Sequence, residues 1–359
     1  MGSGRCTPLG EELASSVASL MKGRGCDCVL FSGGIDTSFV AAAAARAGLR
    51  PRLITVALPG AADAGFPEVV ARALQLELRE AAIDEAAIEE CERTALAVTR
   101  SIDPIEVAAD VAVCLGLRAA REANCRCVAT GDGGDELFLG YPFLFDYDER
   151  GVTEWYSRTL TGSRFASRDL GFALGMPVEL PLYTDEARRI ALEAPLSCKV
   201  GELGGRKYGK ILMREYLEEA GLGFVAWREK VPVTEGSGAM RLIGRWSSGV
   251  DQRTLEELAR DTGIKFPSRA HAHLYLEMRD LCVERPATCA DESRKCPTCG
   301  SCLENGFCRF CGTYVGKGGV VSHYSDGAQP APGEGRRPSG GRSDGSRRNS
   351  FAQGARRPS

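Results

Sequence analysis

The sequence VLFSGGIDTSFVA at residues 29–41 predicts a buried strand, a tight turn and the beginning of a helix. Apolar residues come first, Ser32, Gly33 and Gly34 follow, and an alanine-rich segment comes next. Glycines let a backbone turn sharply and approach a ligand, and the free N–H groups at the beginning of a helix attract anions. The stretch therefore predicts a phosphate-binding turn. It is not a Walker A loop, because it lacks the spacing and the lysine of that loop.

Asp36 lies inside this predicted phosphate-binding turn. A carboxylate beside a bound phosphate repels it unless a cation lies between the two. Mg2+ bridging Asp36 and pyrophosphate oxygens would remove the conflict, because Mg2+ prefers carboxylate and phosphate oxygens as ligands. The alternative is an ordinary surface turn, in which the helix dipole stabilises an acidic residue in the first turn.

A second stretch rich in carboxylates, ATGDGGDELFLGY at residues 129–141, also follows a short apolar run. If this run pairs with the first predicted strand in a parallel sheet, both motifs lie at the same carboxyl edge. Open α/β sheets bind their ligands at that edge. Asp135 would then share one Mg2+ with Asp36, and Asp132 would face the reacting centre. Glu136 is expected to cap or support the helix that follows.

The order of predicted elements divides the chain into four segments. Strands and helices alternate over residues 8–150, which predicts βαβ units, a parallel sheet and the α/β fold class. Residues 151–285 lose this alternation and predict a mostly helical lobe that completes the site. Residues 289–315 are rich in cysteine. Gly, Ser, Pro and Arg dominate residues 316–359, so we expect a disordered basic tail.

Composition and the first residues limit the class of protein. The 359 residues carry a formal net charge of -3 and contain no apolar run of the roughly 18 residues that a membrane span needs. No signal peptide is recognisable, so a cytoplasmic protein without membrane contact is expected. In such a protein the 15 cysteines are expected to be free thiols and metal ligands rather than disulfides. Cys125 and Cys127, on one predicted strand, are expected to point to the same face as buried, inert thiols.

Five cysteines crowd into the stretch CPTCGSCLENGFCRFCG, residues 296–312. Two C-x2-C pairs, each followed by glycine, predict a tetrahedral structural zinc site. The predicted zinc ligands are Cys296, Cys299, Cys308 and Cys311. Cys302 leaves an iron–sulfur arrangement open, because it extends the first pair to C-x2-C-x2-C. Since this segment is far from both carboxylate motifs in the sequence, metal removal is expected to unfold it and to spare the nucleotide site.

Both carboxylate motifs carry a resemblance to a known family. FSGGIDTS, residues 31–38, resembles the pyrophosphatase loop (PP-loop) of the N-type ATP pyrophosphatases. TGDGGDELFLGY, residues 130–141, resembles the second signature of the synthetase domain of asparagine synthetase and of β-lactam synthetase. Looser similarity continues in the same order to about residue 245. The resemblance implies a PP-loop ATP pyrophosphatase (HUP-like) fold. It also implies an ATP-dependent carbon–nitrogen ligase that adenylates a carboxylate such as aspartate, transfers it to ammonia or an amine, and releases AMP and pyrophosphate.

The resemblance also assigns roles to individual residues. ATP and its pyrophosphate would be bound by Ser32, Gly33, Gly34, Asp36, Thr37, Ser38 and Gly131. Asp36 and Asp135 would bind Mg2+, and Asp132 would orient or deprotonate the incoming nucleophile. Lys230, in the stretch WREK, would stabilise the charge that develops on the α-phosphate in the transition state.

The sequence departs from the family in three places, one of which is Leu139, where the family usually has glycine. The family's Pro-Phe-Leu-Asp segment is Pro-Leu-Tyr-Thr at residues 181–184, which leaves the identity of the carboxylate substrate open. Members that use glutamine carry a catalytic cysteine directly after the initiator methionine, but Gly2 stands there in this sequence. We therefore expect no glutaminase domain, and we predict free ammonia or an external amide donor, with a separate glutaminase as a partner.

Two other functions stay open at this point. PP-loop enzymes that modify tRNA also combine adenylation with zinc-binding cysteine pairs, so sulfur transfer to a nucleobase is the first alternative. The basic tail would then contact phosphates of the tRNA. The GDGGDE sequence and the acidic remainder of the chain favour the amidating branch instead. The second alternative is not enzymatic: the nucleotide fold would persist, and the cysteine segment would bind protein partners.

Overall fold

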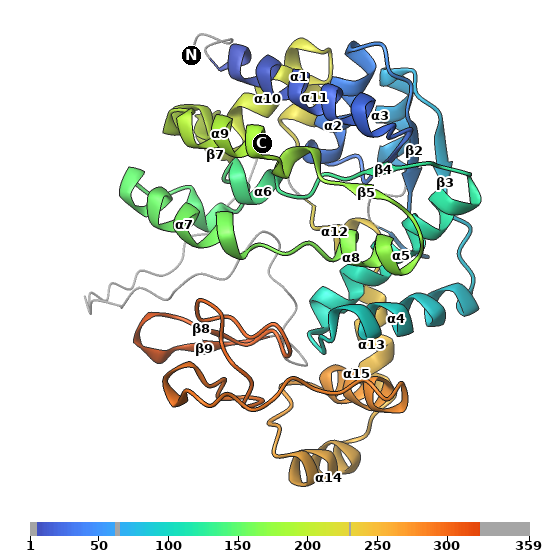
Figure 1. Cartoon of the computed structure of the whole chain (residues 1–359), viewed down its shortest axis with the longest axis vertical. Helices are drawn as coiled ribbons and strands as arrows, with labels where there is room; N and C mark the ends of the chain where they lie inside the picture. The colour runs from blue at the N-terminus through green and yellow to red at the C-terminus, as the bar shows by residue number, and fades with distance from the viewer. Residues whose placement is uncertain (1–5, 62–64, 230, 324–359) are drawn as a thin grey trace, which may run out of the picture.

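The centre of the computed structural model, which describes residues 6–61, 65–229 and 231–323, is a five-stranded parallel sheet (Figure 1). The strand order is β3-β2-β1-β4-β5. The strands are β1 (Cys28–Leu30), β2 (Arg52–Thr55), β3 (Leu78–Glu80), β4 (Val128–Ala129) and β5 (Val178–Glu179). All neighbouring pairs are parallel. The predicted α/β class with a parallel sheet is confirmed.

The central strand β1 lies between β2 and β4. Val29 of β1 pairs with Leu53 on one side and with Ala129 on the other. Parallel strands in this register end at the same edge of the sheet. The segments that follow β1 and β4 therefore leave the sheet side by side, as the sequence predicted for the two carboxylate motifs.

Helices from the first half of the chain cover both faces of the sheet (Figure 1). They are α1 (Thr7–Arg24), α2 (Ile35–Arg46), α3 (Phe66–Leu74), α4 (Glu85–Thr99), α5 (Pro104–Glu122) and α6 (Gly134–Leu137). Alternate residues of β1 enter different cores: Val29 packs with α1 and α2, and Cys28 packs with α5. A sheet covered on both faces needs such apolar strands. Within the described residues, no helix is both long and apolar enough to cross a membrane.

The second half of the chain is mostly helical, and most of its helices pack into cores that they share with the first half. Its longer helices are α7 (Glu149–Gly162), α8 (Ala166–Ala173), α9 (Asp185–Glu193), α10 (Ile211–Glu219), α13 (Met240–Ser248), α14 (Gln252–Thr262) and α15 (Arg269–Asp280). Helix α7 packs instead in a small cluster with Leu139 and Leu144. Strand β5 completes the sheet, and α9 and α10 share the core of α1 and α2. Helices α13 and α15 pack against α4 and α5. An antiparallel hairpin of β6 (Val200–Leu203) and β7 (Arg206–Gly209) precedes α10.

Eight cysteines form disulfides, which the sequence analysis did not expect. The pairs are Cys6–Cys198, Cys26–Cys127, Cys28–Cys125 and Cys289–Cys302. The prediction of inert thiols on one face was wrong, because residues 125–127 precede the strand and are not regularly extended. Cys125 enters the core beneath α5, and Cys127 enters the core beneath α2. Cys127 meets Cys26, which lies just before β1, and Cys125 meets Cys28, the first residue of β1.

We predict that denatured, metal-free and unreduced protein reacts with maleimide at seven cysteines. The remaining cysteines are expected to react only after reduction, because they are paired in the folded chain. Mass spectrometry of the labelled protein counts both sets. Labelling of all 15 cysteines before reduction would contradict the four pairs.

Lys199, between α9 and β6, is a buried lysine. It is 4% exposed, and its ammonium lies 5.1 Å from the centre of the Tyr156 ring. Burial lowers the pKa of Lys199 from 10.5 to about 8, although the charge of Glu149 partly opposes this shift. The folded state therefore disfavours the charged form of this lysine.

We predict that Lys199→Met stabilises the protein by about 2 kcal/mol at pH 7, because it removes a buried ammonium. The pKa of Lys199 is lower in the folded state than in the unfolded state, so the wild-type protein gains stability as the pH rises from about 8 to 10.5. The variant lacks this gain. Thermal unfolding of both proteins at neutral and alkaline pH measures the difference, and a difference that does not change with pH would refute the assignment.

Candidate active site and metal centre

A cavity of about 420 Å3 opens at the carboxyl edge of β1, β2 and β4. Its walls are the turn after β1, the loop after β4, the middle of α5 and the chain between α10 and α13. The predicted site residues that line it are Ser32, Gly33, Gly34, Asp36, Thr37, Gly131, Asp132 and Asp135. Two motifs that are far apart in the sequence thus meet in one cavity.

Hydrogen bonds within the turn after β1 fix its shape. Gly34 N donates to Ser32 Oγ over 3.3 Å, and Thr37 Oγ1 donates to Gly34 O over 3.3 Å. Gly33 has a φ of 73°, and a Cβ at this position would lie 3.2 Å from the Phe66 ring. Glycine avoids both the strain and the crowding. Helix α2 begins directly after this turn, and the free N–H groups of its first turn can bind an anion.

Ser38 supports the turn from inside the protein and does not line the cavity. It is fully buried, and its hydroxyl donates to Gly33 O over 3.1 Å. The resemblance implied direct contact with pyrophosphate. In this structure the side chain instead holds the backbone of the turn.

The carboxylates of the two motifs converge on one ammonium group. Lys210 Nζ lies 2.7 Å and 2.6 Å from the two oxygens of Asp36, and 2.8 Å from Asp135 Oδ1. Gly131 permits the approach of the two motifs, because a Cβ at this position would lie 2.8 Å from the Cβ of Asp36. Burial lowers the pKa of Lys210, but the charges of Asp135 and Asp36 outweigh burial and raise this pKa above its ordinary value. Lys210 is therefore charged, and both carboxylates lie within reach of a single cation.

Lys210 is a site residue that the sequence analysis missed. It lies between β7 and α10, its side chain is 4% exposed, and its φ is 60°. A lysine directly before a helix is unfavourable, because its positive charge lies at the positive end of the helix dipole. That conflict, in the stretch KYGKILMREY, was the signal that could have revealed it.

We predict that Lys210→Met destabilises the protein without Mg2+ by about 3 kcal/mol, because it leaves two carboxylates facing each other without a cation. Mg2+ should restore stability to the variant more than to the wild-type protein, since the ion can replace the lost charge. Thermal unfolding without added Mg2+ and in excess Mg2+, with the four-cysteine site left loaded in both, measures both effects. An equal response of the two proteins to Mg2+ would mean that Asp36 and Asp135 do not share an ion.

Asp132 lines the cavity beside these carboxylates. Thr130 Oγ1 donates to Asp132 Oδ2 over 2.9 Å, and Ser167 Oγ donates to the same oxygen over 2.5 Å. Burial raises the pKa of Asp132, the two hydroxyls oppose this, and the charges of Asp36 and Asp135 raise the pKa further. A carboxyl group with a raised pKa on a cavity wall can accept a proton from a ligand. The position of Asp132 is compatible with the role that the resemblance implies.

Glu136 reaches the cavity as well, so its expected role as a helix support is incomplete. The Tyr141 hydroxyl donates to Glu136 Oε1 over 2.5 Å, and Trp155 Nε1 donates to the backbone oxygen of Glu136 over 2.9 Å. Burial and the charge of Asp135 raise the pKa of Glu136 to about 7. Glu136 and Tyr141 form one wall of the cavity.

Two positions named in the comparison with the family remain: Lys230, which precedes α12 (Val233–Gly236) in the sequence, and Thr184, which precedes α9. Lys230 lies outside the described residues, so its contact with the α-phosphate stays a prediction. Arg228, Glu229 and Val231 line the cavity, which brings this stretch to the site. Thr184, which replaces the family's aspartate, accepts a hydrogen bond from Ala187 N over 3.1 Å and caps α9.

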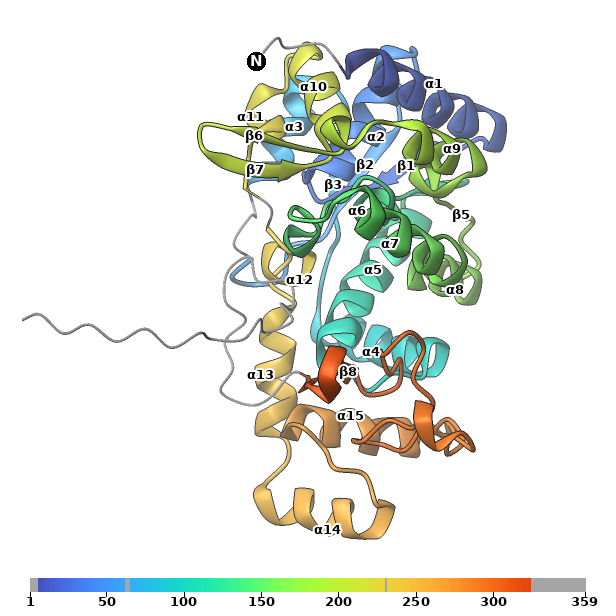
Figure 2. The ribbon, with the colours of Figure 1, turned by 90° about the vertical axis from the view of Figure 1, so that its left-hand side faces the viewer.

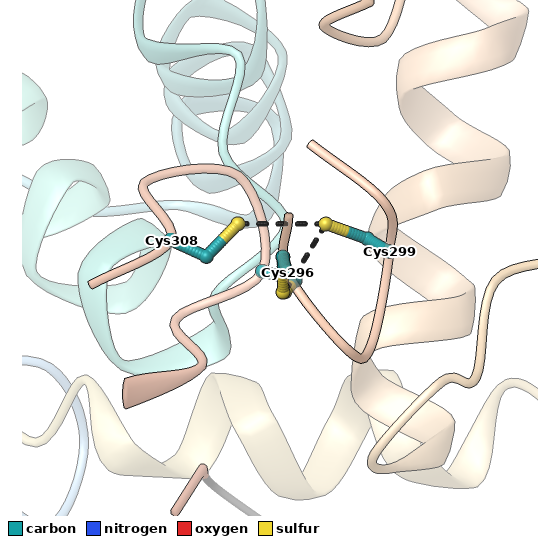
Figure 3. A group of neighbouring side chains, drawn as sticks. Cys296, Cys299 and Cys308 are labelled. Atoms are coloured by element: carbon teal, nitrogen blue, oxygen red, sulfur yellow. Dashed lines mark hydrogen bonds between the residues drawn. The ribbon is translucent and has the colours of Figure 1, made fainter. Parts of the chain in front are cut away.

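The four predicted zinc ligands gather at one point, as Figure 3 shows for three of them. The sulfurs of Cys296, Cys299, Cys308 and Cys311 all lie within 4.8 Å of one another. Cys296 Sγ is 3.7 Å from Cys311 Sγ, and Cys299 Sγ is 3.4 Å from Cys308 Sγ. Four thiolates around a tetrahedral ion with bonds of about 2.3 Å have sulfurs about 3.8 Å apart. The four sulfurs therefore fit a zinc ion.

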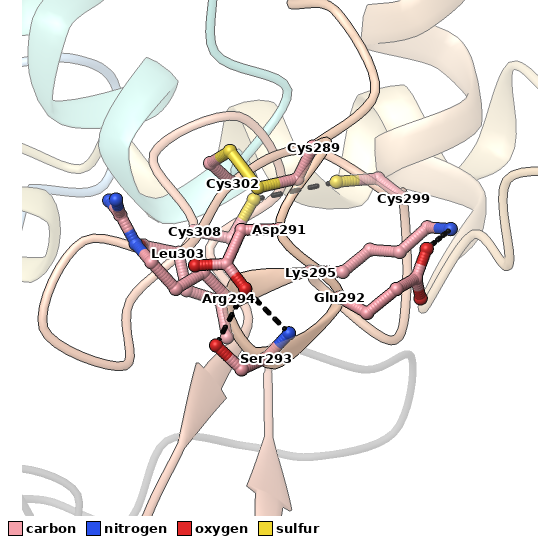
Figure 4. Close-up of a disulfide and its surroundings, with 10 residues drawn as sticks. All are labelled: Cys289, Asp291, Glu292, Ser293, Arg294, Lys295, Cys299, Cys302, Leu303 and Cys308. Carbon is pink, nitrogen blue, oxygen red and sulfur yellow. Dashed lines mark hydrogen bonds and ion pairs between the residues drawn. A yellow bond between two sulfur atoms is a disulfide. The ribbon is translucent and has the colours of Figure 1, made fainter.

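Cys302 forms a disulfide with Cys289 and is not a fifth ligand (Figure 4). The alternative C-x2-C-x2-C arrangement for an iron–sulfur cluster needs this thiol. The disulfide removes that alternative, and the four-cysteine set remains.

The cysteine segment shares an apolar core with the helices around α5. Phe310 packs in one cluster with residues of α4, α5, α13 and α15, and Figures 1 and 2 show this segment beside α4 and α15. Ile102 N donates to Phe310 O over 2.6 Å, just before α5 begins. A Cβ at Gly312 would collide with the side chain of Asp103, which caps α5. The segment thus holds the beginning of the helix whose middle lines the cavity.

Comparison with known proteins bears on the first half of the chain. Residues 9–174 match the asparagine synthase family. The resemblance of this segment to the synthetase domain is confirmed. A curated protein of Methanocaldococcus jannaschii with the name "Putative asparagine synthetase (glutamine-hydrolyzing) 1" is 29% identical over 213 residues. The match covers 56% of this chain, and the chain spans 39% of the length of that relative.

Two solved structures are similar at low identity. A predicted subunit of tRNA methyltransferase from Methanocaldococcus jannaschii is 19% identical, covers 54% of this chain and 87% of its own, and has a TM-score of 0.27. NMN synthetase from Francisella tularensis is 13% identical, covers 80% of this chain and 99% of its own, and has a TM-score of 0.37. Both scores are too low to support an argument about function.

Proposed function

We propose that this chain is an ATP-dependent ligase that adenylates a carboxylate and transfers the acyl group to ammonia or an amine. One observation carries the proposal. Asp36 and Asp135 come from two separate motifs, and both lie within 2.8 Å of the same ammonium nitrogen. They do so in a cavity that a phosphate-binding turn also lines. A site with converging carboxylates and a phosphate-binding turn is suited to a nucleotide with its metal ion.

The donor set fits Mg2+, which binds to carboxylate oxygens and commonly enters sites together with phosphates. Asp36 and Asp135 would hold the ion, which would neutralise charge on the pyrophosphate. The turn at Ser32, Gly33 and Gly34 would bind the pyrophosphate through backbone N–H groups.

The reaction proceeds in two steps. An oxygen of the substrate carboxylate attacks the α-phosphorus of ATP, and pyrophosphate leaves. Ammonia or an amine then attacks the carbonyl carbon of the acyl-adenylate, and AMP leaves with the bridging oxygen. Asp132 accepts the proton that the nitrogen loses, and Lys230 stabilises charge on the α-phosphate in the first step.

Aspartate or a related acid is the proposed carboxylate, and ammonia or an external amide donor is the proposed nitrogen source. A separate glutaminase is the partner that would supply ammonia. We also propose Zn2+ as the resident ion of the four-cysteine site, where it has a structural role. The alternative of sulfur transfer to tRNA, which combines adenylation with zinc-binding cysteine pairs, stays a prediction. Residues 316–323 of the expected disordered tail are described, and Val321–Ser322 form strand β9, paired with β8 (Tyr314–Val315), whereas residues 324–359 lie outside the described residues.

An ATP–pyrophosphate exchange assay tests the proposal. Radiolabelled pyrophosphate should enter ATP only when the adenylated substrate is present, because exchange requires reversal of the first step. A panel of amino acids and other carboxylic acids, with bulk tRNA as a parallel arm, identifies the class of substrate. Exchange that depends on an acid supports the ligase. Exchange that depends on tRNA alone would overturn it in favour of RNA modification.

A further inference from the structure

The hydrogen bonds to the Asp132 carboxylate are asymmetric. Thr130 Oγ1 and Ser167 Oγ both donate to Oδ2, at 2.9 Å and 2.5 Å. Within the described part of the chain, Oδ1 accepts no hydrogen bond from another residue. One oxygen is thus held by the protein, and the other is available to a ligand in the cavity that Asp132 lines.

Ser167 is placed firmly enough to hold that oxygen. It is 4% exposed and lies in the first turn of α8, which packs against α5 and β5. A Cβ at Gly171 in the same helix would lie 2.4 Å from the side chain of Val178 in β5. Such close packing leaves α8 little freedom to move relative to the sheet. Within the described residues, Ser167 is not among those that line the cavity.

We propose that Ser167 is a positioning residue, which holds Oδ2 of Asp132 so that Oδ1 accepts the hydrogen bond and then the proton of the attacking nitrogen. This inference rests on the proposed function for the identity of the nucleophile. A fixed carboxylate loses less orientational freedom when the nucleophile binds, and its acceptor oxygen stays in the attack geometry. Neither motif in the sequence points to Ser167, because it lies on a helix beyond both of them.

The charged groups around Asp132 and the hydroxyls bonded to it together set its pKa. Asp36 on α2, Asp135 on α6 and Asp110 on α5 all interact with Asp132, and like charges favour protonation of the carboxyl group. Lys210 lies between Asp36 and Asp135 and reduces their effect. The hydroxyls of Ser167 and Thr130 stabilise the ionised form of Asp132 against burial and these charges. Loss of the Ser167 hydroxyl therefore raises the pKa of Asp132.

Ser167→Ala removes the hydroxyl, and Ser167→Thr keeps it. We expect Ser167→Ala to lower the rate of amide formation about 10-fold at neutral pH and to move the acid limb of its pH profile up by about one unit. ATP–pyrophosphate exchange should change less than about twofold, since adenylation precedes attack by the amine. Ser167→Thr should restore the profile. Ser248→Ala is the matched control, because that hydroxyl donates to Arg245 O in an exposed helix end.

A measurement that needs no turnover separates this inference from the proposed function. Carboxyl 13C shifts of labelled aspartates give the pKa of Asp132, assigned by its absence in Asp132→Asn. We expect this pKa to rise by about one unit in Ser167→Ala and by less in Ser167→Cys, which is a weaker donor of similar size. An unchanged pKa with an unchanged pH profile would overturn the role of Ser167. If wild-type protein shows no ATP–pyrophosphate exchange with any acid, the proposed ligase function is wrong. The measured effect of Ser167 on the pKa of Asp132 would still hold.

Discussion

Asp36→Asn and Asp135→Asn should each lower the rate of ATP–pyrophosphate exchange by about 1000-fold, the size expected when a preorganised charge at a reacting phosphate is lost. The structure places both carboxylates within 2.8 Å of one ammonium nitrogen, so each change removes half of the negative charge that would hold Mg2+. An amide of the same shape keeps the packing and removes the charge. The two variants should also need far more Mg2+ for whatever exchange remains.

Asp185→Asn is the matched control for these two variants. Its side chain is 99% exposed and pairs with Arg188 on the surface at 3.1 Å. Such surface pairs contribute little to stability, so this variant should exchange at the wild-type rate. Circular dichroism confirms that all three proteins are folded. Near-wild-type exchange in either Asp36→Asn or Asp135→Asn would refute the shared-ion site.

The sequence predicted those parts of the site that depend on local geometry and on one property of parallel sheets. The turn at Gly33 and Gly34 follows from glycine's backbone freedom, which is a local property. The meeting of Asp36 with Asp135 follows because parallel strands end at one edge. Neither inference needed contacts from elsewhere in the chain.

The parts that sequence analysis missed all depend on packing between distant segments. Lys210 reaches Asp36 across 174 positions, through a hairpin whose direction no local pattern specifies. Ser167 reaches Asp132 from a helix placed by its packing on β5. The disulfide partners of Cys125 and Cys127 depend on a bend before β4, and an alternation rule applied to residues 125–127 cannot predict that bend.

The cysteine segment shows the same limit in a different form. Two C-x2-C pairs predicted the ligand set Cys296, Cys299, Cys308 and Cys311 from spacing alone, and the four sulfurs do gather. Distance in the sequence suggested that this segment is independent of the nucleotide site. The structure shows that Phe310 and its neighbours share a core with α4, α5, α13 and α15. Separation along the chain is therefore a poor guide to energetic independence.

Cys308→Ser should release the bound metal ion. The resulting loss of stability should extend well beyond the cysteine segment into the rest of the fold. Structural zinc sites of this kind supply about 10–16 kcal/mol of apparent folding free energy, as much as the net stability of a whole domain. Cys308 is fully buried in the core that includes α5, so the loss should unfold residues beyond the segment itself. Metal analysis should show about one zinc per wild-type chain and none in the variant. Hydrogen exchange should show lost protection at the beginning of α5.

The effect should reach the nucleotide site, contrary to what distance in the sequence suggested. Ile102 and Asp103 contact the segment at the beginning of α5, and Ala112 and Val113 in the middle of the same helix line the cavity. We therefore expect chelation to weaken ATP binding at least about 10-fold, since a wall of the cavity loses its support. Cys282→Ser is the control, because Cys282 is an exposed free thiol whose loss should leave metal content, stability and ATP affinity unchanged. If chelated protein keeps its ATP affinity while α5 loses protection, the helix does not transmit the effect, and the two sites are independent after all.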